Sequence, residues 1–311
     1  MKSLILLLAP LLLGGCMSKK NLRTSAGPIV TTTGMIGDVA RNIVGNTRPV
    51  TSLINEGADP HIYIATKGDI DHIVSASLIL YNGHHLEGKM ASILSKRKNA
   101  IALSEQDLEK ELLRGQAGQV DPHLWMDVSL WSAVAQHIGK HLTGLCPQNA
   151  ALYRQNLARY QQKLERLDSY ATQAIASIPA DQRVLITAHD AFSYLGRAYQ
   201  IEVRAIQGIS TDSEAGSHEI EELVDFVVSR KIPAIFVESS VSKKSIQAVV
   251  EGAAARGHTL RLGGELYSDA LGPAGSYQGT YIGMIDHNIT TIVKALGGSV
   301  PPRGFQNQLS Q

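Results

Sequence analysis

Short apolar runs alternate with amphipathic stretches along most of the chain. Runs rich in β-branched residues predict buried strands, and apolar positions at three- and four-residue steps predict helices between them. Strand and helix in strict alternation favour parallel sheets with helices on both faces, so the predicted fold class is α/β. The strands are predicted at residues 29–33, 49–54, 78–81, 100–103, 183–187, 201–206, 234–237 and 259–262, and the helices near 35–45, 66–76, 87–97, 217–230, 241–256 and 280–297.

One long helix is predicted between the two sets of strands, over residues 147–179. It opens at Pro147 and closes before Pro179, and its apolar positions recur every three or four residues over 157–178. At about 1.5 Å per residue, roughly 30 residues extend ~45 Å, well beyond the usual helix of a globular protein. The pattern therefore predicts two lobes, each with a parallel sheet flanked by helices, joined by one rigid helix.

The first residues have the pattern of a bacterial secretion signal. Lys2 precedes an apolar run over 4–13, which is far shorter than the roughly 20 residues that a membrane-spanning helix needs. The run ends in Gly14-Gly15-Cys16, and residues 13–16 resemble a lipobox, in which the cysteine is lipidated and begins the mature chain. The expected organisation is a signal peptide over 1–15, a tether over 16–27, a first lobe over 28–146, the connecting helix over 147–179 and a second lobe over 180–311.

Charge and cysteine content narrow the function classes. The chain has 29 basic and 28 acidic residues, so no long-range field favours nucleic acid as a partner. It has two cysteines. With Cys16 lipidated, Cys146 has no partner for an internal disulfide and is predicted to be a small apolar filler. The fold must therefore be held by packing.

Three histidines and one aspartate in polar loops are the candidates for chemistry: His61, His123, His189 and Asp269. His61, His189 and Asp269 each come soon after a predicted strand, and ligands bind at the carboxyl ends of the strands in open parallel sheets. Neutral imidazole together with carboxylate suits zinc, iron or manganese. Two ligands from each lobe would place one ion between the lobes.

The tripeptide Asp-Pro-His occurs twice, at 59–61 and at 121–123. A single histidine on a loop is usually a surface or capping residue, and Asp-Pro is common in turns because aspartate accepts backbone hydrogen bonds there. The repetition favours binding, because proline fixes the backbone before the imidazole and so reduces the entropy lost when the side chain is held in a coordination geometry.

Five segments in order along residues 29–296 resemble the cluster of solute-binding lipoproteins that deliver zinc, manganese or iron to ABC importers. The resemblance implies two α/β lobes bridged by one long helix, and it assigns the metal ligands to His61, His123, His189 and Asp269. We expect a monomer, lipid-anchored at the cell surface or in the periplasm, that docks on a permease whose ATPase subunits drive uptake. The segments are Gly57-Ala58-Asp59-Pro60-His61-Ile62-Tyr63, Asp121-Pro122-His123-Leu124-Trp125-Met126-Asp127, Ala188-His189-Asp190-Ala191-Phe192, Gln207-Gly208-Ile209-Ser210-Thr211 and Tyr267-Ser268-Asp269-Ala270-Leu271-Gly272.

The resemblance does not choose the transported metal. Members with Glu at the third ligand position are commonly manganese proteins, whereas His189 resembles the zinc or mixed-metal branch. Dedicated zinc members often carry a His- and acid-rich loop before the second ligand, yet residues 104–120 contain no histidine. Manganese, zinc and iron therefore all remain open.

Glu238 and the pair His84 and His85 are secondary candidates. Glu238 ends a predicted strand, where it is either an acceptor for an imidazole N–H or a helix cap. Adjacent histidines diverge and do not easily converge on one ion, and in similar family members this loop lies near the site rather than in it.

Two other functions stay open on the sequence. A zinc-dependent hydrolase could use these residues, but catalytic zinc needs a vacant position for water and a nearby general base, and four protein ligands fill the coordination shell. The chain also lacks His-Glu-x-x-His, Gly-x-Ser-x-Gly and a Gly-rich phosphate loop. A surface adhesin of the same fold agrees with lipidation but predicts nothing about the four ligands. We therefore expect a binding protein rather than an enzyme.

Overall fold

The first lobe is built on a four-stranded parallel sheet. The computed structural model describes residues 27–115 and 118–310. Within them, the strands pair in the order β2-β1-β3-β4, and every strand predicted for this lobe is present. β1 is two residues shorter than predicted because Thr33 is already the residue before helix α1. The strands are β1 (Ile29–Thr31), β2 (Val50–Ser52), β3 (Leu78–Tyr81) and β4 (Ala100–Ala102).

Three helices accompany this sheet: α1 (Gly34–Val44), α2 (Lys67–Ser75) and α3 (Ala91–Leu94). The helix predicted at 87–97 is therefore a single turn. The reason is the buried carboxylate of Glu87, which accepts hydrogen bonds from the Thr32 hydroxyl and from the main-chain N–H of Asn82 and Gly83. These bonds hold residues 82–90 in turns.

The second lobe pairs its parallel strands two by two. β5 (Val184–His189) pairs with β6 (Glu202–Gln207), β7 (Ala234–Glu238) pairs with β8 (Arg261–Leu266), and β5 also lies beside β7. The three predicted helices are present, and a seven-residue helix between β5 and β6 is added to them. The helices are α6 (Ser193–Tyr199), α7 (Ser217–Ser229), α8 (Lys244–Ala255) and α9 (Tyr281–Ala295).

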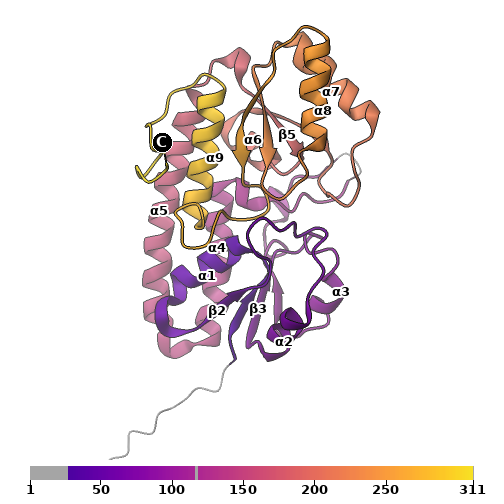
Figure 1. Cartoon of the computed structure of the whole chain (residues 1–311). Coiled ribbons are helices and arrows are strands. Elements are labelled where there is room, and N and C mark those ends of the chain that lie inside the picture. The colour runs from indigo at the N-terminus through magenta and orange to yellow at the C-terminus, as the bar shows by residue number, and fades with distance from the viewer. Residues whose placement is uncertain (1–26, 116–117, 311) are drawn as a thin grey trace, which may run out of the picture.

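The long predicted helix runs beside both lobes. It starts with a 3-10 turn, η4 (Pro147–Asn149), and continues as α5 (Ala150–Ala176), against which α4 (Val128–Leu145) packs. Figure 1 shows α5 along one side of the molecule, next to α1 at one end and α9 at the other. The Tyr160 hydroxyl donates to Asp38 of α1 at 3.1 Å, and the Tyr170 hydroxyl lies 2.9 Å from that of Thr290 in α9. The helix is therefore fastened to both lobes.

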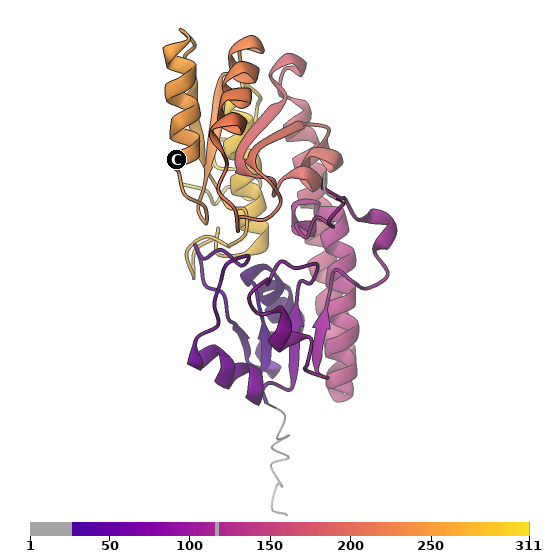
Figure 2. The ribbon, with the colours of Figure 1, turned by 90° about the vertical axis from the view of Figure 1, so that its right-hand side faces the viewer.

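The largest apolar core is shared by the two lobes. One cluster of buried side chains extends from α1 through α4 and α5 to α6 and α9, and it includes Val39, Leu167 and Ile289. Smaller clusters lie between the first sheet and α2, and between the strands of the second lobe and α7 and α8. Figure 2 shows the lobes stacked end to end along α4 and α5. Because α5 contains no glycine or proline, it offers no obvious hinge.

Cys146 is buried, as predicted for a filler side chain. Cys16 and the predicted leader lie outside the described residues. Among the helices that the structure describes, none is both long and apolar enough to cross a membrane.

Candidate metal centre

The four predicted ligands lie on neighbouring loops and strand ends where the lobes meet. His61 is on the loop between β2 and α2, and His123 precedes the short η3 turn (Leu124–Met126) that leads into α4. His189 is the last residue of β5, and Asp269 follows β8. Each of the four residues contributes one nitrogen or oxygen atom, and these four atoms all lie within 4.8 Å of one another. The fold thus brings together residues that are up to 208 positions apart in the chain.

The distances among these atoms suit a single ion. Nε2 of His61 is 3.3 Å from Nε2 of His123, which is 3.4 Å from Oδ1 of Asp269. Nε2 of His189 is 3.2 Å from Oδ2 of Asp269. Donors about 2.1 Å from a tetrahedral zinc ion lie about 3.4 Å from one another. All four residues are at most 2% exposed, so an ion held here would be enclosed by protein.

Two of the converging atoms have no hydrogen-bond partner. They are Nε2 of His189 and Oδ1 of Asp269, and both are buried. Buried polar atoms without partners are rare in native proteins and cost free energy. A metal ion would satisfy both atoms, so the donor set fits a transition metal on chemistry as well as on distance.

The two Asp-Pro-His segments form the same local turn. Oδ1 of Asp59 accepts a hydrogen bond from the main-chain N–H of His61 at 2.9 Å, and Oδ1 of Asp121 accepts one from the N–H of His123 at 3.0 Å. Beyond the turn the aspartates differ. Asp121 also accepts from Nδ1–H of His123 at 2.7 Å, whereas Oδ2 of Asp59 accepts from the Thr211 hydroxyl of the second lobe at 2.6 Å.

Glu238 supports His189 from the end of the adjacent strand. Its Oε2 lies 2.6 Å from Nδ1 of His189, and its Oε1 accepts the main-chain N–H groups of Ala188 and His189 at 2.8 and 2.9 Å. Of the two roles left open by the sequence, this geometry is that of an imidazole acceptor. Such a partner fixes the ring with Nε2 facing the centre.

Neighbouring carboxylates control the protonation of two of the imidazoles. Burial lowers the pKa of His123, but the Asp121 and Asp269 carboxylates outweigh it and raise that pKa to about 9. Burial also lowers the pKa of His189, but the Glu238 and Asp269 carboxylates outweigh it and hold that pKa well above its ordinary value. Both imidazoles therefore carry a proton at neutral pH that an incoming metal ion must displace.

The other two predicted ligands are already in the protonation state that a cation needs. Burial lowers the pKa of His61 to about 4, so its imidazole is neutral. Burial raises the pKa of Asp269, but the imidazoles of His189 and His123 outweigh it and hold that pKa well below its usual range. Asp269 is therefore a carboxylate at neutral pH.

Sequence reasoning missed Trp125. Its indole N–H donates to the carbonyl of Ser268, next to Asp269, at 2.8 Å, and its ring lies 5.2 Å from that of His123. Trp125 thus connects the ligand loops of the two lobes. No periodicity signals this role, because the partner is 143 positions away.

His84 and His85 lie beside the centre. They are outside the four-residue cluster but line a cavity of about 570 Å³ that also reaches His61. We call this the histidine cavity.

The chain matches a family model described as zinc-uptake complex component A, periplasmic, over residues 29–295. It is 46% identical over 271 residues to the zinc-binding protein TroA of Treponema pallidum, covering 86% of this chain and 88% of that protein. It is 46% identical over 272 residues to the manganese-binding lipoprotein MntA of Bacillus subtilis, covering 86% and 89%.

Solved structures agree with these matches. The periplasmic zinc-binding protein TroA of Treponema pallidum has a TM-score of 0.85 at 45% identity, over 87% of this chain and 99% of that one. The Fe(III)-bound YtgA of Chlamydia trachomatis has a TM-score of 0.83 at 26% identity, over 89% and 100%. Because the family model spans most of its length, this chain belongs to the family of the periplasmic component A of zinc-uptake complexes.

Proposed function

We propose that this protein is the solute-binding component of an ABC importer and captures one divalent transition metal ion between its lobes. The observation that carries the proposal is the buried cluster of His61, His123, His189 and Asp269, drawn from both lobes of a chain in this family. Relatives of equal identity are named as zinc-binding and manganese-binding proteins. They support a transition metal as the transported substrate and leave zinc, manganese and iron as its candidates.

Elemental analysis of the purified protein tests this function. We expect one equivalent of zinc, manganese or iron per chain, and its loss when any of the four ligands is changed to Ala. His258→Ala is the control, because His258 is bonded to the carbonyl of Ile232 and lies outside the cluster. Full metal content in His123→Ala would remove His123 from the site.

The ion is delivered to a membrane permease and its ATPase subunits. Four protein ligands release an ion slowly, so release requires a partner that binds the opened protein better than the closed one. Deleting the gene should lower the cellular content of the transported metal, and adding that metal outside the cell should relieve the defect. Unchanged contents of all three metals would contradict delivery.

We further propose that the protein acts as a monomer anchored outside the cytoplasmic membrane through lipidated Cys16, with lobes over 28–146 and 180–311 and the connecting helix over 147–179. Its support is the lipobox-like leader and the naming of MntA as a lipoprotein. Cys16→Ser should move the protein from the membrane fraction to the soluble fraction, while Cys146→Ser should not. A Cys16→Ser variant that stays in the membrane fraction would contradict the anchor.

The geometry favours transport over hydrolysis. Catalytic zinc keeps a position for water beside a general base, but four side chains already converge here. Two nearby carboxylates, Asp121 and Glu238, are bonded to imidazole nitrogens, and a third, Asp59, accepts from the Thr211 hydroxyl. Metal-dependent hydrolysis of a peptide or ester by the pure protein would overturn this choice, whereas no observation here favours an adhesin.

A further inference from the structure

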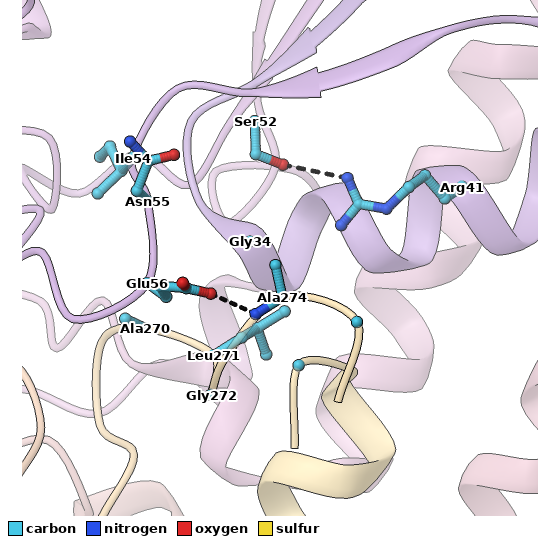
Figure 3. Close-up of a pocket in the computed structure, with 12 residues that line it drawn as sticks. Gly34, Arg41, Ser52, Ile54, Asn55, Glu56, Ala270, Leu271, Gly272 and Ala274 are labelled. Carbon is cyan, nitrogen blue, oxygen red and sulfur yellow. Dashed lines mark hydrogen bonds between the residues drawn. The ribbon is translucent and has the colours of Figure 1, made fainter. Parts of the chain in front are cut away.

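Two cavities flank the line where the lobes meet, and only one offers an imidazole. The first, of about 480 Å³, is lined by residues that include Gly34, Arg41, Ser52, Glu56 and Ala274, and we call it the arginine cavity. Figure 3 shows the Arg41 guanidinium directed at Ser52, and Glu56 accepting the main-chain N–H of Ala274 across the lobes. None of the four metal ligands lines it. Because no histidine lines it, this cavity offers no imidazole that could pass an ion to the centre.

The histidine cavity differs because imidazoles line it. His61 forms part of its wall, and His84 and His85 line it too. A Cβ placed on Gly88 would lie 3.2 Å from the carbonyl oxygen of His61 and 3.6 Å from that of His85, so the two loops pass close together. The cavity therefore joins a partly exposed pair of imidazoles to a buried one.

His61 is the ligand best placed to move. His123 and His189 each have their second ring nitrogen bonded to a buried carboxylate, whereas no carboxylate bonds the ring of His61. His61 also lies on the 53–66 segment, which forms neither helix nor strand. Rotating this side chain breaks no hydrogen bond to a carboxylate.

The loop that carries His84 and His85 is held in place. The carboxylate of Glu87 fixes its start, and the amide of Asn82 donates to the carbonyl of Pro122, directly before His123. Nε2 of His84 donates to the carbonyl of Ser104 at 3.1 Å, which leaves the lone pair of Nδ1 available as a metal ligand. His85 is exposed.

We propose that the metal ion reaches the buried centre through the histidine cavity, and that His84 and His85 bind it transiently before His61 carries it inward. The proposal rests on the proposed metal-carrier function. It needs only one of the two imidazoles to bind the ion at a time. Two cations line this cavity, and both are engaged: Lys89 is paired with Asp212 of the second lobe at 3.2 Å, and the Arg114 guanidinium donates to the carbonyl of Gly118.

A transient site has a kinetic signature that a final ligand lacks. A group that binds the ion only on the way changes the association and dissociation rates by the same factor, so Kd stays the same. A group in the final site changes the dissociation rate and Kd together. Rates and affinity measured on one variant therefore separate the two roles.

The test variant is His84→Asn with His85→Asn. Both positions have a positive φ, of 48° and 62°, which asparagine tolerates, so the variant removes the imidazoles with little strain on the loop. His218→Asn is the control, because His218 is exposed on α7 in the second lobe. Zn²⁺ binding is followed by stopped flow, and Zn²⁺ release is followed with an excess of chelator.

We expect both rates of the double variant to fall by about tenfold with Kd unchanged, and the control to match the unmodified protein. Unchanged rates, or a weaker Kd, would overturn the proposal. If the unmodified protein binds no Zn²⁺, Mn²⁺ or Fe²⁺ at all, the metal-carrier function itself fails, which is a different result.

A second pair of variants tests the route without touching a histidine. Ser210→Trp places a bulky side chain at an exposed position of the histidine cavity, and Ala274→Trp does the same in the arginine cavity. We expect Ser210→Trp to slow both rates and Ala274→Trp to leave them unchanged. The reverse pattern would place the route on the other side of the molecule.

Discussion

The two Asp-Pro-His segments are identical in sequence and unequal in structure. In the segment 121–123, the aspartate binds both the main chain and the ring of its own histidine. In the segment 59–61, the aspartate makes the same turn, but its other oxygen accepts a hydrogen bond from Thr211 in the opposite lobe. One copy therefore fixes a ligand, and the other connects the loop of a ligand to the second lobe.

The comparison shows how one short motif places two predicted ligands in different surroundings. His123 is followed at once by η3 and α4, whereas His61 is followed by an irregular segment that continues to Thr66. The carboxylates of Asp121 and Asp269 raise the pKa of His123 to about 9, whereas burial lowers the pKa of His61 to about 4. The imidazoles of the two segments thus differ in protonation, although both lie in the first lobe.

Removing either histidine should have the largest effect on metal affinity. The two variants should differ in the free energy of unfolding unless the two segments are equivalent. Both His61→Ala and His123→Ala should weaken metal binding by more than about 100-fold, because each deletes a direct ligand. Without metal, only His123→Ala should lower the free energy of unfolding markedly, by about 1–3 kcal/mol, because it leaves the buried Asp121 carboxylate without its ring partner. Competition titration and chemical denaturation measure the two quantities. Equal destabilisation by both variants would contradict the distinction.

Neutralising each aspartate is the next test. Asp121→Asn should weaken metal binding by about 10- to 100-fold, since it keeps an acceptor oxygen but removes the charge that orients His123. Asp59→Asn should cost less than about tenfold, because Asp59 does not contact the imidazole of its histidine. Glu238→Gln is the reference variant, because it neutralises a carboxylate that binds the His189 ring. Equal losses for Asp59 and Asp121 would show that the turn, rather than the ring contact, matters.

Of the two copies, only the second should contribute to the pH dependence of metal binding. Because the pKa of His123 is raised to about 9, metal affinity should fall as the pH is lowered from about 9, where protons increasingly compete with the ion. The sign is opposite for the stability of the protein without metal. In the protein without metal, the proton on His123 contributes its full stabilisation at any pH below about 6.5, the ordinary pKa of histidine. This contribution is lost as the pH rises through about 9.

Affinity titrations and thermal unfolding across this pH range measure both trends. His61 has a pKa of about 4 and should release no proton on binding, so substituting it should leave the pH slope unchanged. A slope that disappears in His61→Ala would contradict the assignment.

The smallest effect is expected from Thr211→Val, which removes the hydrogen bond to Asp59 and keeps the shape of the side chain. A single hydrogen bond contributes about 0.5–1.5 kcal/mol, so metal release should quicken by roughly two- to tenfold. Thr172→Val is the control, because Thr172 is exposed on α5 and bonds within its own helix. Equal rates in the two variants would show that this contact does not restrain the His61 loop.

The sequence predicted the features that depend on local order. Alternation of apolar and amphipathic runs predicted the α/β class and the approximate place of each described strand, because strands buried on both faces form continuous apolar runs. The last strand was displaced, since β8 extends to Leu266 and the prediction ended at residue 262. The apolar stripe over 157–178 predicted the long helix, and buried positions such as Tyr160, Leu167 and Ala174 confirm it. The ligands could be predicted as candidates because polar residues after parallel strands gather at one edge of a sheet.

Only the tertiary structure decided what each candidate contacts. Asp59 and Thr211 are 152 positions apart, and His189 and Glu238 are 49 apart, so no local pattern encodes these pairs. The helix predicted at 87–97 was wrong in length for the same reason, since Glu87 bonds to Thr32, which follows strand β1 and is 55 positions away. Local sequence fixes which side chains are available and their spacing along an element. Their hydrogen-bond partners, protonation and freedom to move depend on which distant segments pack beside them and exclude water.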